Sequence, residues 1–295
     1  MGVGYQGLQF ALLAKRRRVN FARTITLGRQ NHYLDVGTLR SMFERFRVPL
    51  NAAEEADILQ TPYSESLFKK LGAVAVDSVD ASNYEGASLI HDFNQPVDPS
   101  LHQRYTCVID YGSLEHIFNF PVAIKNVTDL MEVGGHFLSM TTANNFMGHG
   151  FYQFSPELFF SYLSANGYVD IGVYLVPFRI FPYFFRVTDP RELGGRVELV
   201  NSEPILIAVI AKKKKHVPQM VVPLQSDYSQ QFWQGRDVNR RVQAPPTDPK
   251  LTTAISDLKA RVASLANWSE SISPHLTNGF ENSLQYQLID PAKDS

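Results

Sequence analysis

Short apolar runs alternate with amphipathic stretches along the first 215 residues. The runs are rich in β-branched and aromatic residues and predict seven strands, at residues 24–27, 73–79, 88–90, 105–109, 136–140, 169–176 and 205–211. The amphipathic stretches predict helices at residues 3–20, 38–46, 64–71, 121–131 and 156–165. Such alternation is typical of a mostly parallel sheet with helices on both faces. The last two strands lack a helix between them, so we expect an antiparallel strand at one edge.

Residues 105–156 are the most informative segment. They predict a strand, a helix, a tight turn at Gly134-Gly135 and a second strand, which together form a βαβ unit. Polar residues follow each of the two strands. Ligands of open α/β sheets bind at the carboxyl ends of the strands, so the segment predicts a site at this edge of the sheet.

The composition changes after residue 215. Residues 1–215 are predicted to form the α/β domain, and residues 216–295 an extended, proline-containing linker followed by a helix. An apolar stripe marks that helix at Leu251, Ile255, Leu258, Val262 and Leu265. The stripe has two interpretations, docking onto its own domain or a homodimer contact.

Bulk composition excludes several classes of protein. Hydrophobic residues make up 44% and charged residues 19%, which is the balance of a globular protein and not of a disordered one. A net charge of −1 gives no electrostatic indication of nucleic-acid binding. The single cysteine, Cys107, cannot form an internal disulfide, and no signal peptide or membrane span is predicted. We therefore expect a cytoplasmic protein. No cluster of Cys, His or Asp predicts a metal site.

Several motifs resemble one enzyme family. They are Leu114-Glu115-His116-Ile117 after the fourth predicted strand, Glu132–His136 with its two glycines, and residues 145–156. With Asp80 and Asp92 after the second and third strands, they look like class I S-adenosylmethionine-dependent methyltransferases, in particular bacterial small-molecule and sugar methyltransferases. The resemblance covers about residues 20–212 and is most specific in residues 105–156. It implies a Rossmann-like seven-stranded sheet and S-adenosylmethionine as cofactor.

The resemblance also implies cofactor-binding residues. A carboxylate at a strand end can accept hydrogen bonds from both ribose hydroxyls, and Asp80 is the first candidate, with Asp77 as the second. The alternative for Asp80 is a loop N-cap. Asp92 could accept from the adenine amino group while Phe93 packs on the ring. The alternative is an Asx-turn into the next residues.

The loop after the first strand departs from the family because it holds one glycine, Gly28, where several are usual. One glycine still permits a close backbone approach at one point. Arg29 or Gln30 could then contact the methionine carboxylate. Tyr111, after the fourth strand, is a further candidate at the cofactor or the acceptor.

Methyl transfer to a hydroxyl needs a group that removes a proton, and histidine suits this role near neutral pH. His116 and His149 are the two candidate bases. The alternative roles are a helix-terminus or packing residue for His116 and a loop hydrogen bond for His149. Asn144, Asn145 and Tyr152 could orient a polar acceptor.

These residues favour O-methylation of a sugar or another small polar metabolite. The alternative is a methyltransferase-like protein without catalysis that acts in binding or assembly. A dinucleotide-dependent enzyme is disfavoured, because the chain lacks the G-x-G-x-x-G turn after its first strand.

Overall fold

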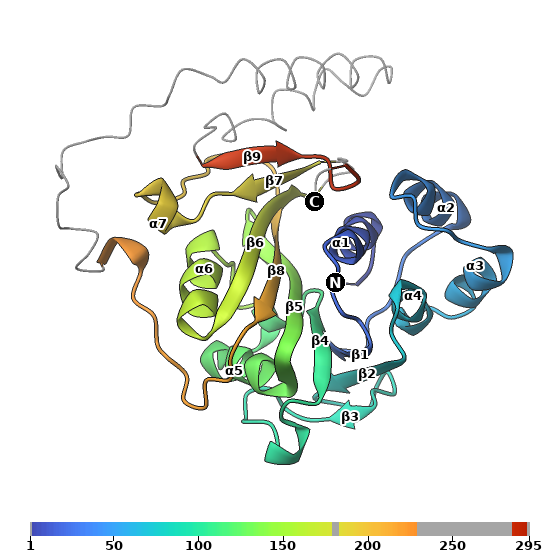
Figure 1. Cartoon of the computed structure of the whole chain (residues 1–295), viewed down its shortest axis with the longest axis horizontal. Coiled ribbons are helices and arrows are strands. Elements are labelled where there is room, and N and C mark those ends of the chain that lie inside the picture. The colour runs from blue at the N-terminus through green and yellow to red at the C-terminus, as the bar shows by residue number, and fades with distance from the viewer. Residues whose placement is uncertain (1, 179–182, 229–284, 294–295) are drawn as a thin grey trace, which may run out of the picture.

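The structure, a computed structural model, describes residues 2–178, 183–228 and 285–293. The predicted C-terminal helix with its apolar stripe lies outside these residues. A nine-stranded sheet in the order β3-β2-β1-β4-β5-β8-β6-β7-β9 organises the described chain (Figure 1). Its strands are β1 (Arg23–Leu27), β2 (Ala75–Asp80), β3 (Leu89–Ile90), β4 (Tyr105–Asp110), β5 (Met131–Asn144), β6 (Tyr168–Pro177), β7 (Phe184–Val187), β8 (Ile205–Lys213) and β9 (Tyr286–Ile289).

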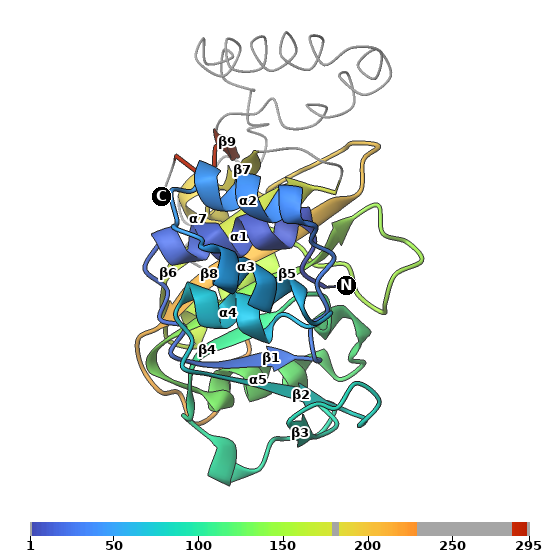
Figure 2. The same cartoon turned by 90° about the vertical axis from the view of Figure 1, so that its right-hand side faces the viewer.

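Helices cover both faces of the sheet. One face carries α1 (Tyr5–Arg16), α2 (Val36–Arg45), α3 (Ala52–Leu59) and α4 (Glu65–Leu71), which face the viewer in Figure 2. The other face carries α5 (Phe120–Leu130) and α6 (Pro156–Ala165) (Figure 1). The short helices are α7 (Pro190–Leu193), η1 (Pro99–Leu101), η2 (Leu114–His116) and η3 (Ser226–Tyr228). None of the described helices has the length and apolar character needed to cross a membrane.

The sheet separates two hydrophobic cores. In β4, Val108 belongs to the core under α5 and α6, whereas Cys107 and Ile109 belong to the core under α1–α4. Successive side chains of a strand point to opposite faces, so a continuous apolar run serves both cores. This confirms the predicted α/β class with helices on both faces.

Local signals define several helix ends. Ser155 accepts a hydrogen bond from the Leu158 amide at the start of α6, as the Ser155-Pro156 pair predicted. Gly72 ends α4 with a φ of 118°, a left-handed conformation that favours glycine. A capping box between Asn51 and Glu54 begins α3, a helix that the hydrophobic pattern did not predict.

Three predictions about the sheet were wrong. The sheet has nine strands and not seven, because β7 and β9 extend it beyond β6. The antiparallel strand β8 does not lie at an edge but pairs with β5 on one side and β6 on the other. Since both pairs are antiparallel, β5 and β6 run in the same direction.

The third wrong prediction is the tight turn at Gly134-Gly135, since both residues lie within β5. A side chain at Gly135 would meet the Met131 side chain at 2.6 Å and the Thr106 carbonyl at 3.1 Å. The pairing of β4 with β5 is irregular between Tyr105 and Cys107, beside these glycines. The glycines therefore accommodate a strand irregularity, which in sequence resembles a turn.

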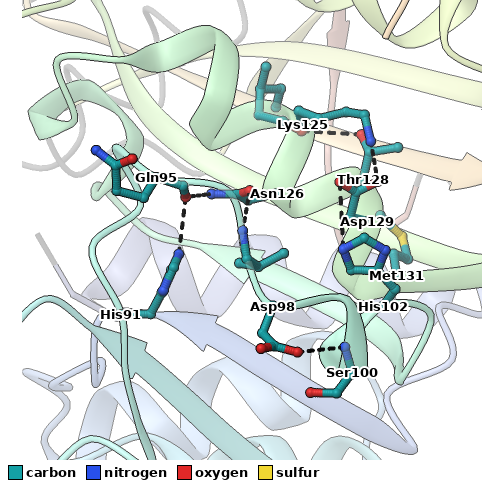
Figure 3. A network of polar contacts seen from close by, with 12 residues as sticks. His91, Gln95, Asp98, Ser100, His102, Lys125, Asn126, Thr128, Asp129 and Met131 are labelled. Atoms are coloured by element: carbon teal, nitrogen blue, oxygen red, sulfur yellow. Dashed lines mark hydrogen bonds and ion pairs between the residues drawn. The ribbon is translucent and has the colours of Figure 1, made fainter. Parts of the chain in front are cut away.

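A polar network fixes the connection between β3 and β4 (Figure 3). Asn126 of α5 donates to the Gln95 carbonyl at 2.8 Å and accepts from the Val97 amide at 3.0 Å. The ring of His91 contacts the same Gln95 carbonyl at 3.0 Å. The network supplies partners to backbone groups of a loop without regular structure. It thereby holds the loop that carries Asp92 against α5.

Stability is expected to fall as the pH drops from about 6.5 to about 4, partly because of His136 on β5. Burial, Lys212 and Arg17 lower the pKa of His136 to about 4, although Asp170 opposes the shift. Between these pH values the unfolded chain binds a proton at His136 that the folded chain excludes. At this half-buried site, solvent screening reduces the effect to on the order of 1–2 kcal/mol.

Thermal unfolding measured from pH 4 to pH 8 tests the role of His136. The variant His136→Gln should show a weaker pH dependence over this range, and His102→Gln, on a surface loop, should behave as the wild type. Identical pH profiles for wild type and His136→Gln would contradict the prediction.

Candidate functional site

The carboxyl ends of β1, β2 and β4 meet around Gly28. Leu27, the last residue of β1, pairs with Val79 of β2 and with Asp110 of β4. Gly28 then adopts a φ of 69°, and a side chain at this position would lie 3.3 Å from the Ser113 hydroxyl and 3.8 Å from Asp80 Oδ2. The single glycine of the loop therefore lets the backbone pass between the ends of two neighbouring strands.

Gln30 and Arg29 differ in whether their side chains already have partners within the protein. Gln30 is buried, and its side-chain amide donates to the Leu27 carbonyl, while its Oε1 has no hydrogen-bond partner in the described chain. Arg29 is engaged: it pairs with Glu65 at 2.7 Å and lies 3.8 Å over the ring of Tyr63. An unpaired buried acceptor is unfavourable unless a ligand supplies a donor. Gln30, rather than Arg29, therefore offers a binding group at this loop.

The two candidate carboxylates of β2 have different surroundings. Asp80 lies at the end of the strand, where Oδ1 accepts from the Ser82 amide at 2.9 Å and Oδ2 faces Gly28. Asp77 lies inside the strand, and its Oδ2 accepts from the Tyr105 hydroxyl at 3.0 Å. Asp80 thus caps its loop and still presents an oxygen to the edge of the sheet.

Three other residues that were predicted to bind the cofactor have contacts elsewhere than at Gly28. Asp92 accepts from the Asn94 amide at 2.9 Å, which is the Asx-turn alternative, and this bond lowers the pKa of Asp92. Phe93 is buried in the core under α5 and α6. Tyr111 is buried in the other core and donates to the Gly7 carbonyl of α1 at 3.1 Å. The described contacts of these residues are therefore structural.

Two carboxylates are buried at this edge of the sheet, Asp110 at the end of β4 and Glu115 in η2, and neither was a candidate site residue from the sequence. Asp110 accepts from the Ser113 amide at 2.8 Å and from the Ser139 hydroxyl at 2.8 Å. Burial, and the nearby charge of Glu115, raise the pKa of Asp110 to about 7. Burial also raises the pKa of Glu115, which accepts from the Thr141 hydroxyl at 2.7 Å. Perturbed carboxylates at a strand end are typical of functional sites.

The two predicted bases come together beside Glu115. The rings of His116 and His149 are 4.8 Å apart, edge to face, although His116 belongs to η2 and His149 to the loop after β5. His149 Nε2 lies 3.6 Å from Glu115 Oε1. Burial lowers the pKa of both histidines, which favours neutral imidazoles at pH 7. Neutral imidazole can accept a proton or bind a metal ion.

Exposed apolar side chains lie within two residues of each histidine in the sequence. Phe118, Met147 and Phe151 are exposed, and the rings of Phe118 and Phe151 stack edge to face at 5.6 Å. The Tyr152 hydroxyl donates to the Phe118 carbonyl at 2.6 Å, which joins the loop after β5 to the segment after η2. These side chains provide an apolar rim beside polar groups.

The predicted acceptor-binding amides are held within the protein. Asn144 donates to Asn201 Oδ1 at 2.9 Å, and Asn145 donates to the Glu203 carbonyl at 2.7 Å. Both bonds fix the start of the loop that carries His149 to the segment before β8. Their described role is therefore to hold this loop.

No protein-family model and no curated protein matches the chain. Similar solved structures include TehB from Haemophilus influenzae, with 14% identity, a TM-score of 0.37, and coverage of 68% of this chain and 61% of that chain. The YcgJ protein from Bacillus subtilis has 10% identity and a TM-score of 0.36, with coverage of 70% and 98%.

A third similar structure is 1,6-didemethyltoxoflavin-N1-methyltransferase from Burkholderia thailandensis, which contains 1,6-didemethyltoxoflavin and S-adenosylhomocysteine. It has 12% identity and a TM-score of 0.31, with coverage of 70% of this chain and 77% of that chain. Similarity at this level does not define an activity.

Proposed function

We propose that the chain is an S-adenosylmethionine-dependent methyltransferase that methylates a hydroxyl oxygen of a sugar or another small polar metabolite. The observation that carries the proposal is the position of Ser113. Its hydroxyl donates to the Leu27 carbonyl at 2.7 Å and adjoins Gly28, and the residue directly precedes η2, which holds Glu115 and His116. Ser113 therefore connects the polar strand ends around Gly28 with the segment that carries Glu115 and His116.

The residues at Gly28 fit the polar groups of S-adenosylmethionine. Asp80 Oδ2, which lies beside Gly28, would accept hydrogen bonds from ribose hydroxyls. The unpaired Gln30 Oε1 suits the α-ammonium group of the methionine moiety, because an amide oxygen accepts from a charged donor. Gly28 permits the close backbone approach that such a ligand needs.

The histidine pair would act on the acceptor. When bound, the cofactor supplies a methyl group on a sulfonium sulfur, which leaves as a neutral thioether. The acceptor oxygen must lose its proton as the new bond to carbon forms, and the His149 imidazole would take it. Glu115 lies behind His149 and would stabilise the imidazolium that results. The apolar rim of Phe118 and Phe151 would hold the carbon skeleton of the acceptor.

Asp80→Ala is expected to weaken cofactor binding by about 1–3 kcal/mol, since charged hydrogen bonds to the ribose are lost. Calorimetric titration of the wild type and the variant with S-adenosylhomocysteine measures this difference. Asp57→Ala, an exposed carboxylate on α3, is the matched control and should bind as the wild type. Failure of the folded wild-type protein to bind S-adenosylmethionine or S-adenosylhomocysteine would overturn the proposed function.

A second candidate function is binding or assembly without methyl transfer. The single glycine in the loop after β1 favours it, because methyltransferases of the resembled family usually have several. Transfer of a tritiated methyl group to a panel of sugars and small polyols separates the two functions. Cofactor binding without transfer to any of them would favour the second.

A further inference from the structure

Three potential metal ligands converge at the carboxyl end of β4. Glu115 and His116 come from η2, and His149 comes from the loop after β5. One ligand atom from each residue lies within 4.8 Å of the others. Within the described residues, this group brings together two imidazoles and a carboxylate, and its geometry does not depend on any bound molecule.

Glu115 supplies an independent indication of a ligand. The residue is fully buried, and its Oε2 accepts from the Thr141 hydroxyl. Among the described residues, the other oxygen, Oε1, is buried without a hydrogen-bond partner and faces His149 Nε2, which also lacks one. A buried carboxylate oxygen is unfavourable unless it is paired, protonated or bound to a metal ion.

The separation of these two atoms suits shared coordination. At 3.6 Å they are too far apart for a hydrogen bond. Two donors that each lie about 2.0–2.1 Å from a tetrahedral Zn²⁺ ion are separated by roughly 3.4 Å. Only a small adjustment would let both atoms bind one ion. The exposed His116 side chain can rotate toward the same point.

The backbone holds the ligand-bearing segments in place. The Phe151 and Tyr152 amides both donate to the Glu115 carbonyl, at 2.7 and 3.2 Å. A side chain at Gly150 would meet the same carbonyl at 2.7 Å, and Gly150 has a φ of 71°. Only glycine permits this approach, so the loop carrying His149 is fixed against Glu115 before any ion binds.

We propose that Glu115, His116 and His149 bind one divalent transition-metal ion of the Zn²⁺ type. Two imidazoles and one carboxylate form a typical catalytic zinc ligand set, which leaves a coordination position open. The hydrogen bond from the Thr141 hydroxyl to Oε2 would hold the Glu115 carboxylate in the orientation that the ion needs. The proposal that the ion binds does not depend on the proposed function, but the role of the ion in methyl transfer rests on that function.

In that role, the acceptor hydroxyl occupies the open position. A bound cation lowers the pKa of a coordinated oxygen, so the proton leaves to solvent before the oxygen attacks the methyl carbon. The histidines then act as ligands instead of taking the proton directly. Activity that depends on added Zn²⁺, and is lost with a chelator, is the expected consequence.

Titration of the full, metal-free chain with Zn²⁺ by calorimetry tests the site. We expect one ion per chain, and Co²⁺ in its place should give the intense visible absorption of a four-coordinate site. His116→Gln and His149→Gln should each weaken binding at least tenfold. The exposed position of His116 makes its variant safe for folding. His102→Gln is the matched control, because His102 also lies near a carboxylate, with its Nε2 at 4.0 Å from Asp129, but is not one of the proposed ligands. This variant should leave the affinity for Zn²⁺ unchanged.

Unchanged Zn²⁺ affinity in both His116→Gln and His149→Gln would overturn the proposal, as would the absence of stoichiometric binding to the wild type. Titration of the metal-free protein with S-adenosylhomocysteine separates this failure from failure of the proposed function. Cofactor binding without zinc binding would reject the metal site alone, and zinc binding without cofactor binding would reject the methyltransferase alone.

Discussion

Replacing Lys213 with methionine is expected to lower the free energy of unfolding by about 2–4 kcal/mol. Lys213, at the end of β8, is fully buried, and its ammonium group donates to the carbonyls of Thr128 and Met131 at 2.7 and 2.6 Å. These carbonyls lie where α5 ends and β5 begins (Figure 3). Methionine fills a similar volume but cannot donate, so two carbonyls would lose their partner. Urea-induced unfolding, followed by circular dichroism, measures the loss.

The neighbouring Lys214 provides the matched control. It is exposed, so Lys214→Met should change the free energy of unfolding by less than about 0.5 kcal/mol. Burial lowers the pKa of Lys213 to about 8, so the group is mostly protonated at pH 7, where all three donors are present. Equal stability of the two methionine variants would show that Lys213 does not hold the junction of α5 with β5.

The sequence predicted the strand-helix alternation well because strands such as β4 and β8 are buried and mostly apolar on both faces. Ile109 and Val108 serve opposite cores, and such a continuous run is visible without any knowledge of its partners. The helix at residues 156–165 was also predicted in full, because Ser155 and Pro156 mark its start locally. Signals that act within a few residues were therefore reliable.

Features that depend on distant residues were not visible. The position of β8 between β5 and β6 depends on pairing partners far along the chain, and no local pattern encodes it. The strand at Tyr286–Ile289 pairs with β7 although it lies in the predicted extension. At Gly134-Gly135, two glycines in a strand and two glycines in a turn give the same sequence pattern.

In the candidate site, too, local signals were visible in the sequence and contacts between distant residues were not. His116 and His149 were predicted separately, and the structure places their rings side by side. Glu115 belongs to a motif that was recognised in the sequence, but it was not predicted as a site residue, since nothing local distinguishes a buried glutamate from an exposed one. Its burial follows from the loop after β5, whose amides bind the Glu115 carbonyl. The cluster therefore arises from tertiary structure rather than from the spacing of its residues.

His149→Ala is expected to lower the rate of methyl transfer by about 10²–10⁴-fold, the usual effect of losing the group that handles the acceptor proton. His116→Ala should have a smaller effect, because His149 faces the buried Glu115 at 3.6 Å whereas His116 lies at the exposed side of the cluster. Neither change should alter the affinity for S-adenosylhomocysteine. The measurement is single-turnover transfer of a tritiated methyl group to the acceptor found in the sugar and polyol panel.

Rescue experiments assign the function of His149 more sharply than the loss alone. Added imidazole that restores transfer in His149→Ala would assign the proton to this side chain, because a free base then replaces the missing one. Two other results together would assign removal of the proton to a bound ion. Methyl transfer by the wild type would require Zn²⁺, and imidazole would not restore transfer in His149→Ala. Unaltered transfer by His149→Ala would remove His149 from the mechanism, and the buried Oε1 of Glu115 would then need another partner.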